Sequence, residues 1–192
     1  MKFRTKQQVR EYVWRKIEPF STFPPPYNRI PNFRGAERAC ERVKELKEWE
    51  KAEVVFSAPD SPLRRLRELC LEQGKILVMA KPHMKGLVAI DPEKRVRGTL
   101  KELLRAGREI DWRDLPEVDL FVQGCVAVDL TGNRIGKGKG YGDREYSMLK
   151  NVKCYIVVCH ELQVFDDLSY LCEEHDAKCD VILTPERVIR CR

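Results

Sequence analysis

Apolar residues near the start of the chain recur at a spacing of four. Val9, Val13 and Ile17 therefore share one face of a helix, and the pattern predicts a helix over residues 6–18 with that face buried. Pro19 cannot continue a helix, so the element is expected to end there. Positions 24–26 are all proline, which predicts an extended connector after the helix.

Short apolar runs then alternate with stretches of helical pattern. Strands are predicted at residues 52–57, 75–80, 119–129 with a break at Gln123-Gly124, and 153–159. Residues 179–184 and 187–191 are expected to form a final strand pair or one bent strand. Helices are predicted at residues 35–49, 60–73 with Asp60 as the cap and Gly74 closing it, 99–106 and 143–150, and residues 166–174 are expected to be helical or irregular. This alternation predicts an α/β fold whose mostly parallel sheet is covered on both faces. No repeat divides the chain, so residues 1–192 are expected to form a single domain.

Composition narrows the class of protein. The chain is 43% hydrophobic and 34% charged, so a packed core is expected rather than disorder. No apolar run approaches the roughly 20 residues of a membrane span, and no apolar stretch follows the basic first residues, so neither a membrane protein nor a secretory signal is expected. A net charge of +6 suits a phosphate-bearing partner, without choosing among nucleotide, nucleic acid and anionic cofactor. The abundance of Lys, Arg and Glu is typical of a thermophile's surface.

Eight cysteines invite a disulfide interpretation, but their placement argues against it. They include no CxxC pair, and several stand inside apolar runs such as the one between Cys154 and Cys159. This favours a reduced, cytoplasmic protein that uses cysteine as a small core residue. With only three histidines, the sequence shows no zinc-ligand spacing either.

The densest chemical signal is the segment 132–143, which has glycine at positions 136, 138, 140 and 142. Bare backbone can approach a ligand closely and point its N–H groups at phosphate oxygens. Arg134, Lys137 and Lys139 add positive charge to the same loop, and Asp143 next to it is a natural Mg²⁺ ligand. Neither a Walker A motif nor a Rossmann fingerprint is present, so a flexible, solvated glycine hairpin is the alternative to a phosphate site.

A second acidic position, Asp176, lies shortly before the last strands. Loops at the carboxyl edge of a parallel sheet gather into one crevice, so Asp143 and Asp176 could meet at one cation. The alternative is a solvated acidic loop, in which His175 is a loop or capping residue. His160 and Gln163 follow a predicted strand and receive no assigned role.

The basic run at 64–67, Arg-Arg-Leu-Arg, could contact nucleic acid. Glutamates at 68 and 72 dilute its charge, which favours a mixed, solvated helix face.

The segment 133–143 resembles the signature loop of the 5-formyltetrahydrofolate cyclo-ligase (methenyltetrahydrofolate synthetase) family. Lys6 and Arg10 resemble that family's amino-terminal Lys-x-x-x-Arg helix, and residues 175–180 resemble its carboxyl-terminal acidic segment. The fuller likeness, which includes residues 29–33 and 124–128, is to the branch called methenyltetrahydrofolate synthetase domain-containing proteins. It runs over nearly the whole chain.

The resemblance implies a three-layer α/β/α sandwich of the NagB/RpiA/CoA-transferase type. It also implies a reaction in which ATP phosphorylates the formyl oxygen of 5-formyltetrahydrofolate, N10 attacks the activated carbon and phosphate leaves, giving 5,10-methenyltetrahydrofolate and ADP. Carried over by position, it implies that Lys6 and Arg10 contact ATP phosphates, that Arg134, Gly136, Lys137, Gly138, Lys139, Gly140 and Tyr141 form the nucleotide loop, and that Asp143 and Asp176 hold Mg²⁺. Arg134, Lys137 and Lys139 would stabilise charge during the transfer.

Two positions depart from the synthetase pattern. Gly142 stands where those enzymes have a second tyrosine, and residues 57–62 are shorter than their acidic folate-binding stretch, whose glutamate has no clear counterpart. The phosphate half of the site is thus expected to be kept and the pterin half altered. The favoured function is an ATP- and Mg²⁺-dependent cyclo-ligase acting on formyl-folate or a related formyl-pterin. The alternative is a non-catalytic nucleotide- or RNA-binding module on the same fold.

Overall fold

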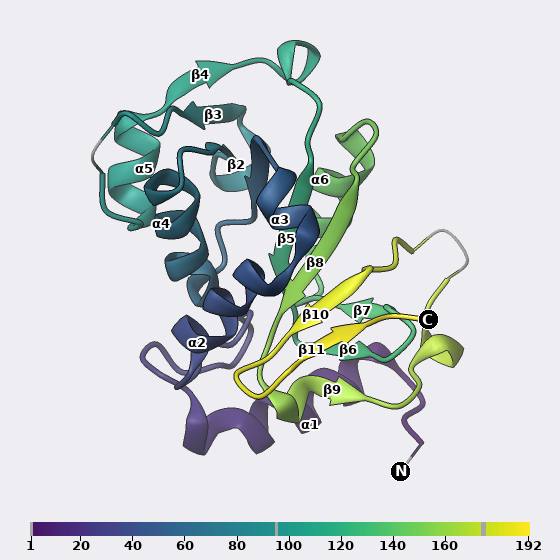
Figure 1. Cartoon of the computed structure of the whole chain (residues 1–192). Helices are drawn as coiled ribbons and strands as arrows, with labels where there is room; N and C mark the ends of the chain where they lie inside the picture. Colours follow the sequence, from purple (N-terminus) through teal and green to yellow (C-terminus); the bar gives the residue numbers. More distant parts are fainter. Residues whose placement is uncertain (1, 95, 174–175) are drawn as a thin grey trace.

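The computed structural model describes residues 2–94, 96–173 and 176–192 (Figure 1). Its largest element is an eight-stranded sheet of order β11-β10-β8-β5-β1-β2-β3-β4. The strands are β1 (Val54–Ser57), β2 (Ile76–Ala80), β3 (Leu87–Ile90), β4 (Arg108–Ile110), β5 (Leu120–Gly124), β8 (Cys154–Val158), β10 (Val181–Leu183) and β11 (Val188–Arg190). The five central strands β10, β8, β5, β1 and β2 run parallel, and the outer strands pair antiparallel.

The central strands are apolar on both faces. Every residue of β1, β5 and β8 is buried, as expected for parallel strands that lie between two layers of helix. The helices are α1 (Lys6–Ile17), α2 (Ala36–Glu41), α3 (Lys47–Lys51), α4 (Arg64–Glu72), α5 (Leu100–Ala106) and α6 (Tyr141–Met148).

Helices pack on each side of the sheet. On one face, Cys40 of α2, Leu66 of α4 and Leu103 of α5 belong to one buried cluster with Val55 of β1. On the other face, Tyr146 of α6 stacks on the β8 ring of Tyr155 with the centroids 5.0 Å apart. The result is the mixed α/β, three-layer sandwich with a mostly parallel sheet that the sequence predicts.

Helix α1 covers a second, three-stranded sheet. That sheet has the order β7-β6-β9 and consists of β6 (Ala127–Asp129), β7 (Arg134–Ile135) and β9 (Val164–Phe165). Val9 and Val13, the apolar stripe seen in the sequence, pack in one buried cluster with Ala127 and Ile135. Figure 1 shows α1 and the small sheet together at the lower end of the molecule.

The structure corrects the predicted second helix and the role of Asp60. Residues 35–49 form separate pieces, because Leu46 has extended angles (φ −97°, ψ 129°) between a 3-10 turn and α3. Burial of Leu46 in the core overrides the local helical pattern here. The Asp60 carboxylate makes no capping hydrogen bond, and its Oδ2 accepts one from Gly124 N instead, at 2.9 Å.

The start of α6 and four short strands also differ from expectation. Helix α6 begins at Tyr141 rather than Asp143, because Gly140 adopts left-handed angles (φ 67°) and starts the helical turn. Strands β3, β4, β7 and β9 are additions that the sequence pattern did not predict. Strands β3 and β4 pair antiparallel beyond β2, and β7 and β9 lie on either side of β6.

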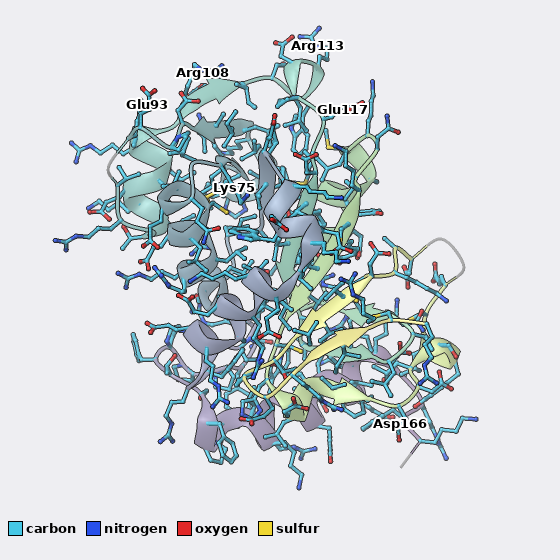
Figure 2. All side chains as sticks on the ribbon, in the orientation of Figure 1. Lys75, Glu93, Arg108, Arg113, Glu117 and Asp166 are labelled. Carbon is cyan, nitrogen blue, oxygen red and sulfur yellow. The ribbon has the colours of Figure 1, made fainter. Side chains whose placement is uncertain are left out.

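Most charged side chains lie outside, as Figure 2 shows for Glu93, Arg108, Arg113, Glu117 and Asp166. Lys75 lies within the molecule, where its Nζ donates to Ala52 O at 2.7 Å and sits 4.9 Å from the centroid of the Trp49 ring. The eight cysteines carry free thiols, mostly buried. In the described residues, no helix combines the length and apolar character needed to cross a bilayer.

Arg67 contradicts the interpretation of residues 64–67 as a solvated face. Its side chain is buried and donates to the carbonyls of Ala58 (3.2 Å), Asp60 (3.0 Å) and Gly98 (3.4 Å). Burial lowers the pKa of Arg67 to about 10, so the guanidinium stays charged at neutral pH. Arg67 therefore anchors the segment that follows β1 and does not offer a contact for nucleic acid.

The turn between β6 and β7 is joined tightly to the carboxyl-terminal segment. Gly132 O accepts from Cys179 N at 2.9 Å, and a Cβ on Gly132 would lie 2.2 Å from Cys179 O. This contact holds the start of the glycine-rich segment against the chain that carries Asp176.

We expect Gly132→Ala to destabilise the fold strongly, because the Cβ would displace backbone and the residue has a φ of +89°. The loss should reach at least about 3 kcal/mol in urea denaturation. Gly74→Ala is the matched control: its φ is +74° but no atom lies within 4 Å of the added Cβ, so it should cost only about 1 kcal/mol. Equal losses in the two variants would contradict the close contact at Gly132.

Candidate functional site

A cavity of about 490 Å³ lies at the carboxyl edge of the central strands. Its walls come from the segments that follow β1 and β2, from the end of β5, and from the glycine-rich segment before α6. This is where loops of a parallel sheet converge. Every residue that the sequence assigns to the site lines this cavity: Lys6, Arg10, Arg134, Gly136, Lys137, Gly138, Lys139, Gly140, Tyr141, Asp143 and Asp176.

The glycine loop, defined here as residues 136–142, packs around the side chain of Arg134. That side chain is only 6% exposed, and its Nε donates to Gly124 O at the end of β5 at 2.9 Å. A Cβ on Gly142 would lie 3.0 Å from Arg134 Nη2, and one on Gly136 would lie 3.2 Å from it. These glycines therefore let the backbone close around a buried guanidinium.

The turn before Arg134 is held by a buried carboxylate. Asp129, fully buried, accepts hydrogen bonds from the backbone N–H groups of Thr131, Asn133 and Leu168 at 2.7–2.9 Å, and from Asn133 Nδ2 at 2.8 Å. Asn133, the first residue of the motif, thus shapes the turn that delivers Arg134 to the cavity.

Helix α1 ties two parts of the cavity wall together. Arg10 Nε donates to Gly136 O at 2.7 Å, and Lys6 Nζ pairs with Asp176 Oδ2 at 2.7 Å. Burial lowers the pKa of Arg10. Lys6 and Arg10 are one turn apart, so a single helix face reaches both the glycine loop and the carboxyl-terminal acidic segment.

The two predicted metal ligands each stand beside a cation. Asp143 Oδ1 lies 3.6 Å from Arg134 Nη1, and Asp176 is paired with Lys6. Carboxylate oxygens are the donors that Mg²⁺ prefers, and one or two of them usually complete its shell with substrate phosphates. The donor set therefore fits Mg²⁺. Across the described ranges, no three His, Cys, Asp or Glu side chains form a ready-made metal cluster. Glu174 and His175, beside Asp176, lie outside the described residues.

Five polar residues of the cavity were missed or misassigned in the sequence analysis: Asp60, Lys81, His83, Gln123 and Glu145. The signal for Gln123 was the polar break at the end of an otherwise apolar strand. Its Nε2 donates to Gly142 O at 3.0 Å, and its Oε1 accepts from Tyr155 OH at 2.8 Å. Both ends of the amide are thus fixed.

Glu145 is a buried carboxyl in the second turn of α6, and only 4% of the residue is exposed. Burial raises the pKa of the Glu145 carboxyl to about 7, and the charge of Asp60 adds to this effect. Arg134, Gln123 and Lys137 act in the opposite direction.

The remaining wall combines apolar and basic side chains. Ala58, Pro59, Met84 and Leu100 line it next to Tyr141 of α6, and Lys81 and His83 line it as well. Such a mixture of apolar walls and a few placed polar groups is typical of sites for small organic ligands.

His160 and Gln163 do not line the cavity. His160 packs between Phe20 and Phe33, with ring centroids 5.4 and 5.5 Å away, and Gln163 Nε2 donates to Cys125 O at 2.6 Å. Both residues hold connecting segments in place.

Comparison with known proteins decides the family. The family model described as "5-formyltetrahydrofolate cyclo-ligase family" matches residues 5–185. The chain belongs to the 5-formyltetrahydrofolate cyclo-ligase family. It is 38% identical to the methenyltetrahydrofolate synthase domain-containing proteins of Homo sapiens and Danio rerio, over 96% and 97% of this chain. The alignments span 53% of those relatives, so the chain covers about half of their length.

Cyclo-ligase relatives of similar size are also found. A probable 5-formyltetrahydrofolate cyclo-ligase of Schizosaccharomyces pombe is 26% identical over 79% of this chain and 84% of the relative. Among solved structures, the 5,10-methenyltetrahydrofolate synthetase of Aquifex aeolicus is similar with a TM-score of 0.70 and 25% identity, over 97% of this chain and 93% of that one. The fold of this cyclo-ligase family member is thus shared along nearly its entire length.

The Glu145 carboxyl makes the stability of this cyclo-ligase family member depend on pH. Its pKa is raised on folding from 4.5 to about 7, so its contribution is fully present below pH 4.5 and is lost as the pH rises through 7. We expect wild type to lose up to about 3 kcal/mol relative to Glu145→Gln over this range in urea denaturation. A difference between the two proteins that stays constant with pH would contradict the raised pKa.

Proposed function

We propose that the chain is an ATP- and Mg²⁺-dependent cyclo-ligase that converts 5-formyltetrahydrofolate, or a related formyl-pterin, to the 5,10-methenyl form with release of ADP and phosphate. The observation that carries the proposal is the convergence of helix α1, the glycine loop and the carboxyl-terminal acidic segment on one cavity. These segments are far apart in the sequence, and their meeting places the loop, two cations of α1 and two carboxylates around one space where a single ligand can contact all of them.

The glycine loop suits the triphosphate. Lys137 and Lys139 are exposed on it and, in the described part of the chain, form no ion pair, so both ammonium groups are available to phosphate oxygens. Arg134, held by Gly124 O, keeps a fixed position from which its guanidinium faces the developing charge. Phosphoryl transfer needs positioning and charge neutralisation rather than a covalent nucleophile, and this loop offers both.

The two cation–carboxylate pairs suit a metal–nucleotide complex. Lys6 and Arg134 carry the positive charges, and Asp176 and Asp143 the negative ones. When the nucleotide binds, Lys6 would turn to a phosphate while Arg134 keeps its place, and the carboxylates would hold Mg²⁺, which neutralises charge on the phosphates.

The apolar wall suits the second substrate. Met84, Leu100 and Pro59 offer the faces between which a flat ring can lie. The similarity to proteins named as cyclo-ligases and methenyltetrahydrofolate synthetases supports a formyl-folate or a related pterin as that ring.

The purified chain, mixed with ATP, Mg²⁺ and 5-formyltetrahydrofolate, should produce the methenyl chromophore and one ADP per product. Omitting Mg²⁺ or ATP should abolish the signal. Absence of turnover with 5-formyltetrahydrofolate and with a panel of formyl-pterins would overturn the proposed activity.

The loop lysines can be tested as a pair. In Lys137→Ala/Lys139→Ala, ATP affinity measured by calorimetry should fall about tenfold or more, because two charge-assisted contacts are lost. The double variant Lys51→Ala/Lys101→Ala, which removes two exposed lysines outside the cavity, is the control for net charge and should bind ATP as wild type does. ATP binding that is unchanged by the loop substitutions would show that the loop is not the phosphate contact.

A non-catalytic RNA-binding role stays the alternative prediction. Retained RNA binding in a gel shift, with a steep dependence on salt and without methenyl formation, would favour it.

A further inference from the structure

The cavity contains an acidic corner, defined here as Asp60 and Glu145. Both carboxyls line the cavity, and the two act on each other electrostatically. Glu145 is almost fully buried, and its carboxyl has a side-chain hydrogen bond with Gln123 and the charge of Arg134 nearby. Carboxyls are rarely buried inside a protein, and this one also lines the cavity, where a ligand can use its remaining acceptor capacity.

Helix α6 places Glu145 on the same side as Tyr141 of its first turn. Tyr141 and Glu145 are four residues apart on that helix, so they share one face, and both line the cavity. Glu145 lines the cavity together with Gln123 near the end of β5, and the Gln123 side chain is hydrogen-bonded to the Glu145 carboxyl.

Gly142 keeps this corner open. A Cβ there would lie 2.7 Å from Gln123 Nε2 and 3.0 Å from Arg134 Nη2, so any side chain at this position would push into the polar groups around Glu145. Gln123 cannot easily move away, because Tyr155 OH and Gly142 O hold both ends of its amide. The space and its polar lining are therefore built by the fold.

The polar groups of the cavity suit two kinds of ligand. Lys137 and Lys139 attract phosphate at the exposed loop, whereas the corner presents two carboxyls that accept hydrogen bonds. Carboxyls accept hydrogen bonds and offer most to a ligand that carries N–H donors. The apolar wall beside the corner accommodates the ring that bears them.

We propose that Glu145, with Asp60 beside it, is a specificity-determining residue that accepts hydrogen bonds from ring N–H groups of the second substrate. This inference rests on the proposed function, which supplies a pterin, a ring with adjacent amide and amino donors. It adds that recognition of the ring comes from α6, the same helix whose start forms part of the phosphate loop.

The test is the affinity of Glu145→Gln for each substrate separately. Binding of 5-formyltetrahydrofolate is measured by calorimetry in the presence of Mg²⁺ and a non-hydrolysable ATP analogue, and binding of that analogue is measured alone. We expect the folate affinity to fall about tenfold or more, since the amide replaces one acceptor oxygen by an NH₂ group, and the nucleotide affinity to stay within about twofold. Glu37→Gln, an exposed glutamate of α2 away from the cavity, is the matched control and should change neither.

Glu145→Asp keeps the charge and withdraws it by one methylene, so it should give an intermediate loss of folate affinity and a folded protein. Folate affinity within about twofold of wild type in both variants overturns the inference, and so does a parallel loss of nucleotide affinity, which would place the carboxyl at the nucleotide. These failures leave the proposed function standing, provided that wild type forms the methenyl product. Wild type that binds no folate overturns both.

Discussion

The hydrogen bond from the buried Arg134 guanidinium to the carbonyl of Gly124 is the contact on which the site depends. It fixes a loop of bare backbone to the end of the central strand β5. The loop can close around the guanidinium because Gly136 and Gly142 have no side chains to collide with it. The alternating glycines therefore serve two purposes: they pack against an arginine and leave backbone N–H groups free to face the cavity.

A loop held in this way must also be held from the other side. Helix α1 does so through Arg10, which binds the carbonyl of Gly136, and through Lys6, which reaches Asp176. The carboxyl-terminal segment is held a second time by the close contact of Gly132 with Cys179. Helix α1, the glycine loop and the carboxyl-terminal segment thus converge because each of them is in direct contact with another. In a preorganised site of this kind, little reorganisation is needed when charge develops on a transferred phosphoryl group.

The sequence alone predicted those parts of the site that are marked by a motif or a periodic pattern within a short stretch of chain. The glycine–lysine loop and the helix with Lys6 and Arg10 were predicted, as were most strands, because periodicity and motif spacing are properties of a short window. The roles of Asp60 and Arg67 were not, because both depend on which carbonyl or N–H lies across a packed interface. Glu145 was missed for a related reason: with α6 expected to begin at Asp143 rather than Tyr141, nothing placed this glutamate on the cavity face.

The glycine loop and the acidic corner are not independent, since both are in contact with the same residues. Arg134 Nη2 lies beside Gly142, and Gln123 binds the carbonyl of that same residue. A side chain at position 142 would therefore disturb the guanidinium that holds the loop and the amide that lies beside Glu145 at once. The lack of a side chain at position 142 therefore couples the two halves of the cavity. A substitution at this position would change the shape of the ring pocket and the stiffness of the phosphate loop together.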